Sequence, residues 1–175
     1  MKGSALPMRE KVMVLLQRDS KFVAGVFTED GLYATCLPRD SEEEAIDAVD
    51  GFDLGESRND EFIRVLNLVF DIYEGNPEVD IHSIRLDFSD LTPKQVAVYK
   101  ATMNIPYGMT QPYGIVAEYA GLPRAARFVG TVMANNRLAP IVPCHRVVAS
   151  NGIGGYGGGI VHKVEFLKRE GAFAE

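Results

Sequence analysis

Apolar positions in the first half of the chain alternate with the period of strands. Short runs rich in β-branched residues predict strands, and Asp30-Gly31 predicts a tight hairpin turn between two of them. A final alternation at Ile84, Leu86 and Phe88 predicts one more strand before the chain changes character. The predicted strands cover residues 12–16, 22–27, 32–37 and 84–88.

Two helices are predicted between these strands. Residues 42–49 follow Ser41, which suits a helix N-cap, and begin with acidic residues that favour a first turn. Residues 59–73 carry apolar side chains at helical spacing on one face. The first half is therefore predicted to be a small α/β domain at residues 1–89, with short strands plus helix.

The second half, residues 90–175, reads as a mainly helical domain. Residues 93–103 predict a helix that starts at a proline, and 105–112 predict a loop. Residues 113–120 and 123–134 then predict two short helices separated by Gly121-Leu122, a pattern typical of a helix-turn-helix.

The end of the chain divides into three segments. Residues 140–148 are apolar and prone to form a strand, with a polar centre. Six glycines then occur within residues 151–159, which predicts a loop. Residues 160–170 predict a helix that Gly171 terminates.

Charge separates the two halves. The whole chain of 175 residues carries a formal net charge of −6. Residues 1–89 hold 9 basic and 19 acidic side chains, a balance of −10, whereas residues 90–175 hold 9 and 5, a balance of +4. The second half can therefore meet phosphate although the protein is acidic.

Composition indicates a folded cytoplasmic protein. Hydrophobic residues make up 46% of the chain, and no apolar run reaches the roughly 20 residues that cross a bilayer. Neither cysteine belongs to a CxxC pair, and three scattered histidines have no zinc spacing. We therefore expect no metal, no cofactor and no membrane partner.

Candidate chemistry concentrates at Pro143–Val148, with the sequence PCHRVV. A thiol becomes a good nucleophile only when a base or a cationic neighbourhood removes its proton. On an extended strand Cys144 and His145 point to opposite faces, so their contact requires a turn or a bridging water. The apolar run before them and the glycine-rich loop after them place the thiol at the floor of a pocket.

From about Thr92 to Gly171 the chain resembles the O6-alkylguanine-DNA alkyltransferases (methylated-DNA–protein-cysteine methyltransferases). The resemblance rests on ordered motifs: IPYG at 105–108, YG at 113–114, PRAAR at 123–127, NN at 135–136, PCHRVV at 143–148, the glycine-rich loop with Tyr156, Lys163, and EG at 170–171. It implies irreversible, single-turnover transfer of an alkyl group from O6-alkylguanine, and also from O4-alkylthymine, in DNA. It also implies a ribonuclease-H-like N-terminal domain.

The resemblance assigns the catalytic roles. Cys144 would accept the alkyl group, His145 would remove the thiol proton through a bridging water, and Glu170 would orient His145. Asn136 would brace the cysteine segment, and Tyr113 would donate its phenolic proton to the departing guanine.

The same resemblance assigns contacts to double-stranded DNA. A base inside a duplex cannot reach a buried thiol, so it must be flipped out. Arg127 would fill the vacated stack, and Arg124 would meet phosphate. Ala126 and Gly130 are small enough to let the recognition helix approach the minor groove closely.

The substrate pocket would be formed by Val147, Tyr156, Gly157 and Gly158. The chain departs from the family pattern at Gly157 and at residues 109–112, where methionine, glutamine and proline replace the usual residues. The glycine-rich loop at 152–159 is also one residue shorter than in some members, and these departures bear on the dimensions of the pocket and on phosphate contacts near the loop. We expect a monomer. Two alternatives are a helix-turn-helix DNA-binding module without chemistry and a cysteine hydrolase that uses Cys144, His145 and Glu170.

Overall fold

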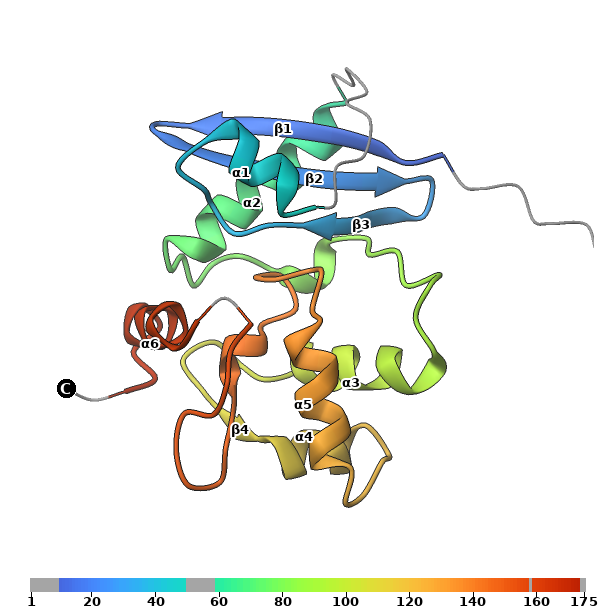
Figure 1. Ribbon diagram of the computed structural model, residues 1–175, viewed down its shortest axis with the longest axis vertical. Coiled ribbons are helices and arrows are strands. Elements are labelled where there is room, and N and C mark those ends of the chain that lie inside the picture. The colour runs from blue at the N-terminus through green and yellow to red at the C-terminus, as the bar shows by residue number, and fades with distance from the viewer. Residues whose placement is uncertain (1–9, 50–58, 158, 174–175) are drawn as a thin grey trace, which may run out of the picture.

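A computed structural model of the protein places a three-stranded sheet at one end and a group of helices at the other (Figure 1). The structure describes residues 10–49, 59–157 and 159–173. The elements are β1 (Val12–Arg18), β2 (Lys21–Thr28), β3 (Gly31–Thr35), α1 (Glu42–Asp47), α2 (Asp60–Tyr73), α3 (Pro93–Met103), β4 (Gln111–Pro112), α4 (Tyr113–Tyr119), α5 (Ala126–Ala134), β5 (Val147–Val148) and α6 (Ile160–Arg169), with 3₁₀ turns at Ile81–Ser83 (η1) and Cys144–Arg146 (η2).

The larger sheet is an antiparallel meander in the order β1-β2-β3. Its strands join through two-residue turns, with Arg18 paired to Lys21 and Thr28 paired to Gly31. Gly31 has φ of +132° and begins β3, so the turn lies at Glu29–Asp30, one residue earlier than predicted.

The two faces of this sheet are covered by different helices, because successive side chains point to opposite sides. Val23 and Phe27 pack with residues of α2, whereas Ala24 and Val26 pack with Ala45 of α1. Figure 1 shows α1 in front of the sheet and α2 behind it. The mixed α/β character predicted for this half is confirmed.

The strand predicted at residues 84–88 is wrong. Leu86 forms only an isolated parallel bridge with Leu32, although Ile84 is buried. The alternation arises because this connecting segment lays apolar side chains on the main core while it passes the edge of the sheet. The alternation of apolar residues therefore reflects burial on one side of the segment, and not the repeated hydrogen bonds of a strand in a sheet.

The start of α3 and the end of α6 follow their local signals closely. Thr92 and Gln95 form a capping box at the start of α3, with Pro93 at the first helical position. The helix α6 ends with Glu170 as its C-cap, and Gly171 then takes φ of +69°.

One apolar cluster joins the two halves. Its members come from the sheet, α2, α3, α4, α5 and η2, and they include Leu66, Tyr99, Val129 and Cys144. The predicted boundary between residues 89 and 90 stays a prediction, since this core has members on both sides of it. No helix in the described part of the chain is both long enough and apolar enough to cross a membrane.

Candidate active site

Cys144 occupies a tight turn instead of the strand predicted for residues 140–148. Cys144–Arg146 form η2, and only Val147–Val148 are extended, as β5 paired in parallel with β4. The Cys144 amide donates to the Val142 carbonyl at 2.8 Å, which folds the chain sharply at Pro143. The strand interpretation failed here because Pro143 has no amide hydrogen to donate to a strand neighbour.

Cys144 is 5% exposed, and burial raises the pKa of its thiol. Interactions with Asn136 and Tyr156, and the positive charge of Lys163, offset part of that rise. The resting residue is therefore a protonated thiol, and its reactivity depends on a neighbouring base.

Asn136 braces the segment that leads to the cysteine. Its side-chain Nδ2 donates to the Val142 carbonyl at 2.8 Å, and its Oδ1 accepts from the Leu138 amide at 3.0 Å. The Val142 carbonyl thus accepts from both Asn136 and Cys144. Both bonds act on the residue immediately before Pro143-Cys144.

His145 and Arg146 share a single carboxylate. His145 Nε2 lies 2.7 Å from Glu170 Oε1, and the imidazole stacks on Phe166 with ring centroids 4.5 Å apart. Arg146 donates from Nε to Glu170 Oε2 at 2.9 Å and from Nη2 to Oε1 at 3.0 Å. Its Nη1 donates to the Ile105 carbonyl at 2.8 Å, so the guanidinium is held on two sides.

These contacts set the protonation states. Burial alone would raise the pKa of Glu170, but hydrogen bonds from His145 and Arg146 outweigh it and lower that pKa to about 2. Burial lowers the pKa of His145, so its neutral form is favoured at neutral pH. Because the carboxylate only accepts, Nε2 carries the proton and Nδ1 keeps a free lone pair. Nδ1 is buried and makes no hydrogen bond to any described residue.

Lys163 ties the glycine-rich loop to β5. Its ammonium donates to the Val147 carbonyl at 2.5 Å and to the Gly155 carbonyl at 3.0 Å. The side chain is fully buried, and burial lowers its pKa to about 8. The Tyr113 hydroxyl donates to the same Gly155 carbonyl at 3.2 Å, and burial raises the pKa of Tyr113, which keeps that hydroxyl protonated.

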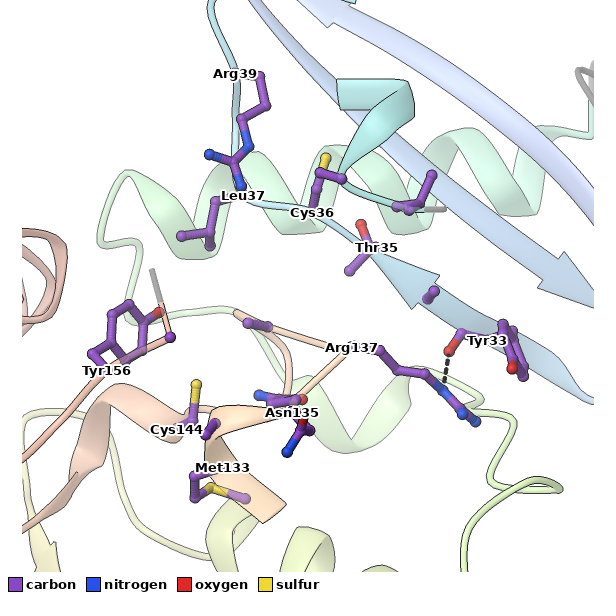
Figure 2. Close-up of a pocket in the computed structure, with 17 residues that line it drawn as sticks. Tyr33, Thr35, Cys36, Leu37, Arg39, Met133, Asn135, Arg137, Cys144 and Tyr156 are labelled. Carbon is purple, nitrogen blue, oxygen red and sulfur yellow. Dashed lines mark hydrogen bonds between the residues drawn. The ribbon is translucent and has the colours of Figure 1, made fainter. Parts of the chain in front are cut away.

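Two cavities of about 500 Å³ each meet at Cys144. The first is lined by Tyr113, Cys144, Tyr156, residues of the glycine-rich loop and the C-terminal part of α5. The second lies between β3 and the active-site turn, and Figure 2 shows the Cys144 sulfur pointing into it beside Tyr156. The Tyr156 hydroxyl is buried beside that sulfur without a well-formed hydrogen bond to any described residue.

The structure brings together Cys144, His145, Glu170, Asn136 and Tyr113. Tyr156 and Gly157 line both cavities, whereas Val147 is fully buried and lines neither. A Cβ at Gly157 would lie 3.0 Å from the Ala134 carbonyl oxygen, so this glycine permits close approach to α5. Gly158 falls outside the described residues.

Three of the residues predicted to contact DNA lie around the start of α5, and the fourth, Gly130, lies in the middle of that helix. Arg127 is exposed in the first turn of α5, next to Ala126. Arg124 was predicted on the same helix, but α5 begins only at Ala126, and Arg124 takes φ of +64° in the preceding turn. Proline at 123 and the left-handed residue after it delay the helix. Gly130 lines the cavity that Tyr113 and Cys144 share, and a Cβ there would meet nothing within 4 Å.

Two residues of the site were assigned no individual role from the sequence. Arg146 and Lys163 were noted only as letters of motifs, although both are buried and bind groups around Cys144. One signal for Arg146 was available, because a charged residue inside an otherwise apolar segment requires a partner when the segment is buried. Within the described residues, no group of three or more His, Cys, Asp or Glu side chains is arranged to hold a metal ion.

Comparison with known sequences places residues 93–172 in the family described as 6-O-methylguanine DNA methyltransferase, DNA binding domain. The methylated-DNA–protein-cysteine methyltransferase of Mycobacterium leprae is 45% identical over 94 residues, 53% of this chain and 56% of that protein. That of Saccharolobus islandicus strain Y.N.15.51 is 39% identical over 125 residues, 71% of this chain and 78% of that protein. The chain spans about half the length of the mycobacterial relatives, 56% and 48%.

Solved structures extend the similarity over nearly the whole chain. The O6-methylguanine methyltransferase of Mycobacterium tuberculosis superposes with a TM-score of 0.69 and 30% identity, covering 95% of this chain and 96% of that one. The structure of M. tuberculosis OGT in complex with DNA gives a TM-score of 0.65 and 30% identity, with 91% and 92% covered.

Proposed function

Because this chain belongs to the methylated-DNA–protein-cysteine methyltransferase family, we propose that it repairs DNA by moving an alkyl group from O6-alkylguanine onto Cys144. The observation that carries the proposal is the thiol at the junction of two cavities, backed by His145 and Glu170. O4-alkylthymine is the second expected substrate. We further propose that the protein acts as a monomer in the cytoplasm.

The reaction follows from the protonation states of the site. The lone pair on His145 Nδ1 accepts the thiol proton through a bridging water, and the Glu170 carboxylate stabilises the imidazolium that forms. The thiolate then attacks the alkyl carbon, a carbon–sulfur bond forms, and the bond from carbon to O6 breaks. Tyr113 donates a proton to the departing guanine and regains one from the site, so the thiol proton is transferred overall to guanine.

The product explains why each molecule acts once. To regenerate the thiol, the carbon–sulfur bond of the thioether would have to break with the Cys144 thiolate as leaving group. His145 and Glu170 can activate water or a thiol, but neither displaces a thiolate from an unactivated alkyl carbon. The cysteine hydrolase alternative would require an acyl-enzyme that water can cleave. A DNA-binding module without chemistry would leave the buried relay of His145, Arg146 and Glu170 without a use.

One methyl group per protein is therefore expected on Cys144 after incubation with a duplex that contains O6-methylguanine. Intact-mass measurement should show a single added methyl, and peptide mapping should place it on Cys144. Cys144→Ala should abolish the gain, whereas Cys36→Ala should keep it: Cys36 lines the same cavity as Cys144, but its sulfur accepts the Ala24 amide at 3.3 Å and burial raises the pKa of its thiol. Repeated turnover, or methylation of Cys36, would contradict the proposal.

We propose that α4 and α5 form a helix-turn-helix that docks on DNA. The two helices pack together through a turn that contains Gly121 at φ of +73°. The Arg127 side chain is exposed and is available to enter the base stack. The ribonuclease-H-like assignment of the first half stays a prediction, which the meander β1-β2-β3 and α2 support.

Arg127→Ala should slow repair of a duplex by on the order of tenfold or more while sparing transfer from free O6-benzylguanine. Only the duplex leaves a vacated stack for Arg127 to fill. Single-turnover rates on the two substrates measure the difference. Arg124→Ala is the matched control, because Arg124 is exposed in the preceding turn and should lose only a phosphate contact. Equal losses on duplex and free base would exclude this role for Arg127.

A further inference from the structure

Arg137 crosses from the active-site segment to the first half of the protein. It follows Asn136 directly, and its Nε donates to the Tyr33 carbonyl at 2.7 Å while Nη2 donates to the Asp87 carbonyl at 3.1 Å. Figure 2 shows the side chain extending from the loop after α5 toward Tyr33 on β3. The main chain adds a third bond, since the Thr35 amide donates to the Arg137 carbonyl at 2.9 Å.

The guanidinium also stacks on the Tyr33 ring, 3.9 Å from its centroid. Lys11 lies over the same ring at 3.6 Å, and the Tyr33 hydroxyl donates to Asp90 at 2.5 Å. Arg137 is thus held by hydrogen bonds and by a cation–π contact to a ring that is itself fixed. A planar guanidinium suits this arrangement better than an ammonium.

The residue before Arg137 holds the cysteine segment. The Asn136 amide binds the Val142 carbonyl at 2.8 Å, and that carbonyl also accepts the Cys144 amide. Asn136 also interacts with the thiol itself. The segment 136–137 is therefore bound to β3 through Arg137, and through Asn136 it holds the segment that carries Cys144.

We propose that Arg137 is a positioning residue, through which the first half of the protein holds Asn136 in register with Cys144. The inference rests on the proposed function, because the position of the thiol matters for alkyl transfer. Loss of the Arg137 side chain leaves the main-chain bond from Thr35 to hold the loop after α5, so the side-chain amide of Asn136 meets the Val142 carbonyl and the thiol at less closely fixed distances. Misplacement of a reacting group by about 1 Å can cost on the order of 100-fold in rate.

The test compares arginine variants in a Cys36→Ala background, in which Cys144 is the only thiol. Rates are measured across pH with O6-benzylguanine and, separately, with iodoacetamide, at a temperature where every variant is folded. Arg137→Ala should react about tenfold more slowly at neutral pH, with the midpoint of its rate–pH profile about one unit higher. Arg137→Lys should recover part of the rate, because it retains the charge over Tyr33.

Two control variants separate positioning from stability. Arg18→Ala removes bonds to Asp71 and Asn67 and a contact with Phe70, which join β1 to α2 far from the cysteine. It should lower the melting temperature as Arg137→Ala does, but leave the rate–pH profile unchanged. Arg64→Ala removes an exposed arginine of α2 and should change neither property.

The outcomes are distinct. The positioning role is overturned if the rate–pH profile of Arg137→Ala matches that of the parent protein. It is also overturned if Arg18→Ala shifts its rate–pH profile as much as Arg137→Ala does. If the parent protein reacts with iodoacetamide but transfers nothing from O6-benzylguanine or from alkylated DNA, the proposed function fails. The iodoacetamide profiles still decide the role of Arg137 in that case.

Discussion

Replacing Glu170 with alanine is expected to lower the free energy of unfolding by roughly 3–5 kcal/mol, because it leaves a buried arginine without its counter-ion. Arg146 is 6% exposed, and two of its donors bind this carboxylate. The Gly108 amide also donates to Glu170 at 3.3 Å. Chemical denaturation of both proteins measures the loss, which is a large part of an ordinary domain's stability of about 5–15 kcal/mol.

Alkyl transfer should slow even where the variant remains folded. Loss of the carboxylate behind a catalytic imidazole costs about 10⁴-fold in hydrolase triads, and we expect at least on the order of 100-fold here. Glu170→Gln keeps the shape but cannot accept from both His145 and Arg146 as a carboxylate does. Its single-turnover rate at low temperature therefore isolates the chemical effect from the loss of stability.

Glu165→Gln is the matched control on the same helix. Glu165 is 47% exposed and pairs only loosely, with His162 at 3.6 Å and Arg169 at 4.0 Å. An exposed pair of this kind contributes about 0–1 kcal/mol, so stability and rate should stay near the parent values. Similar losses in both glutamate variants would show that the buried carboxylate has no special role.

Acid sensitivity should follow from the same carboxylate. The Glu170 pKa lies at about 2 in the folded protein against 4.5 as its ordinary value, so the folded state binds fewer protons in this range. Its stabilisation, roughly 3 kcal/mol, is present above pH 4.5 and is lost as pH falls toward about 2. His145 adds to the loss, because its lowered pKa makes the folded state resist protonation below its ordinary value of 6.5. Glu170→Gln should flatten the acid limb of the curve of unfolding free energy against pH.

Local signals in the sequence determine much of the fold. Capping at Ser41, the proline at position 93 and the terminating Gly171 predict the corresponding helix ends within a residue or two, because caps and these special backbone positions act on backbone groups nearby. The alternation at Ile84–Phe88 was misleading because a connecting segment can bury every second side chain without pairing along its length.

The contacts within the site could be predicted from local sequence patterns only in part. PCHRVV predicts Cys144 as the candidate nucleophile, yet the turn that brings Cys144 and His145 into their observed arrangement depends on Val142 and on Asn136 from another segment. Arg146 and Glu170 meet across 24 positions, and Arg137 and Tyr33 across 104. A sequence pattern records which residues are charged, but only packing decides which charges lose water and require partners.

Lys163→Met is expected to slow alkyl transfer by roughly 10- to 100-fold, because two groups of the site lose a shared donor and the thiolate loses a nearby cation. The ammonium joins the Val147 carbonyl, just after the cysteine turn, to the Gly155 carbonyl in the glycine-rich loop. Methionine is an unbranched side chain that fills buried space but donates no hydrogen bond. Rate–pH profiles with O6-benzylguanine should move to higher pH as well as to lower rate.

The free energy of unfolding should also depend on Lys163, at high pH. The Lys163 pKa is about 8 in the folded protein against 10.5 as its ordinary value, so between these values the unfolded chain binds more protons. The folded state of the parent protein therefore gains stability as pH rises from about 8 toward 10.5, as the buried charge is neutralised. Lys163→Met should lose this rise, whereas exposed Lys168→Met on the same helix should retain both the rise and the parent rate. If the free energy of unfolding depends on pH identically in the parent and in Lys163→Met, then the pKa of this lysine is not lowered in the folded state. Its effect on the rate would then come from its contacts with the loop alone.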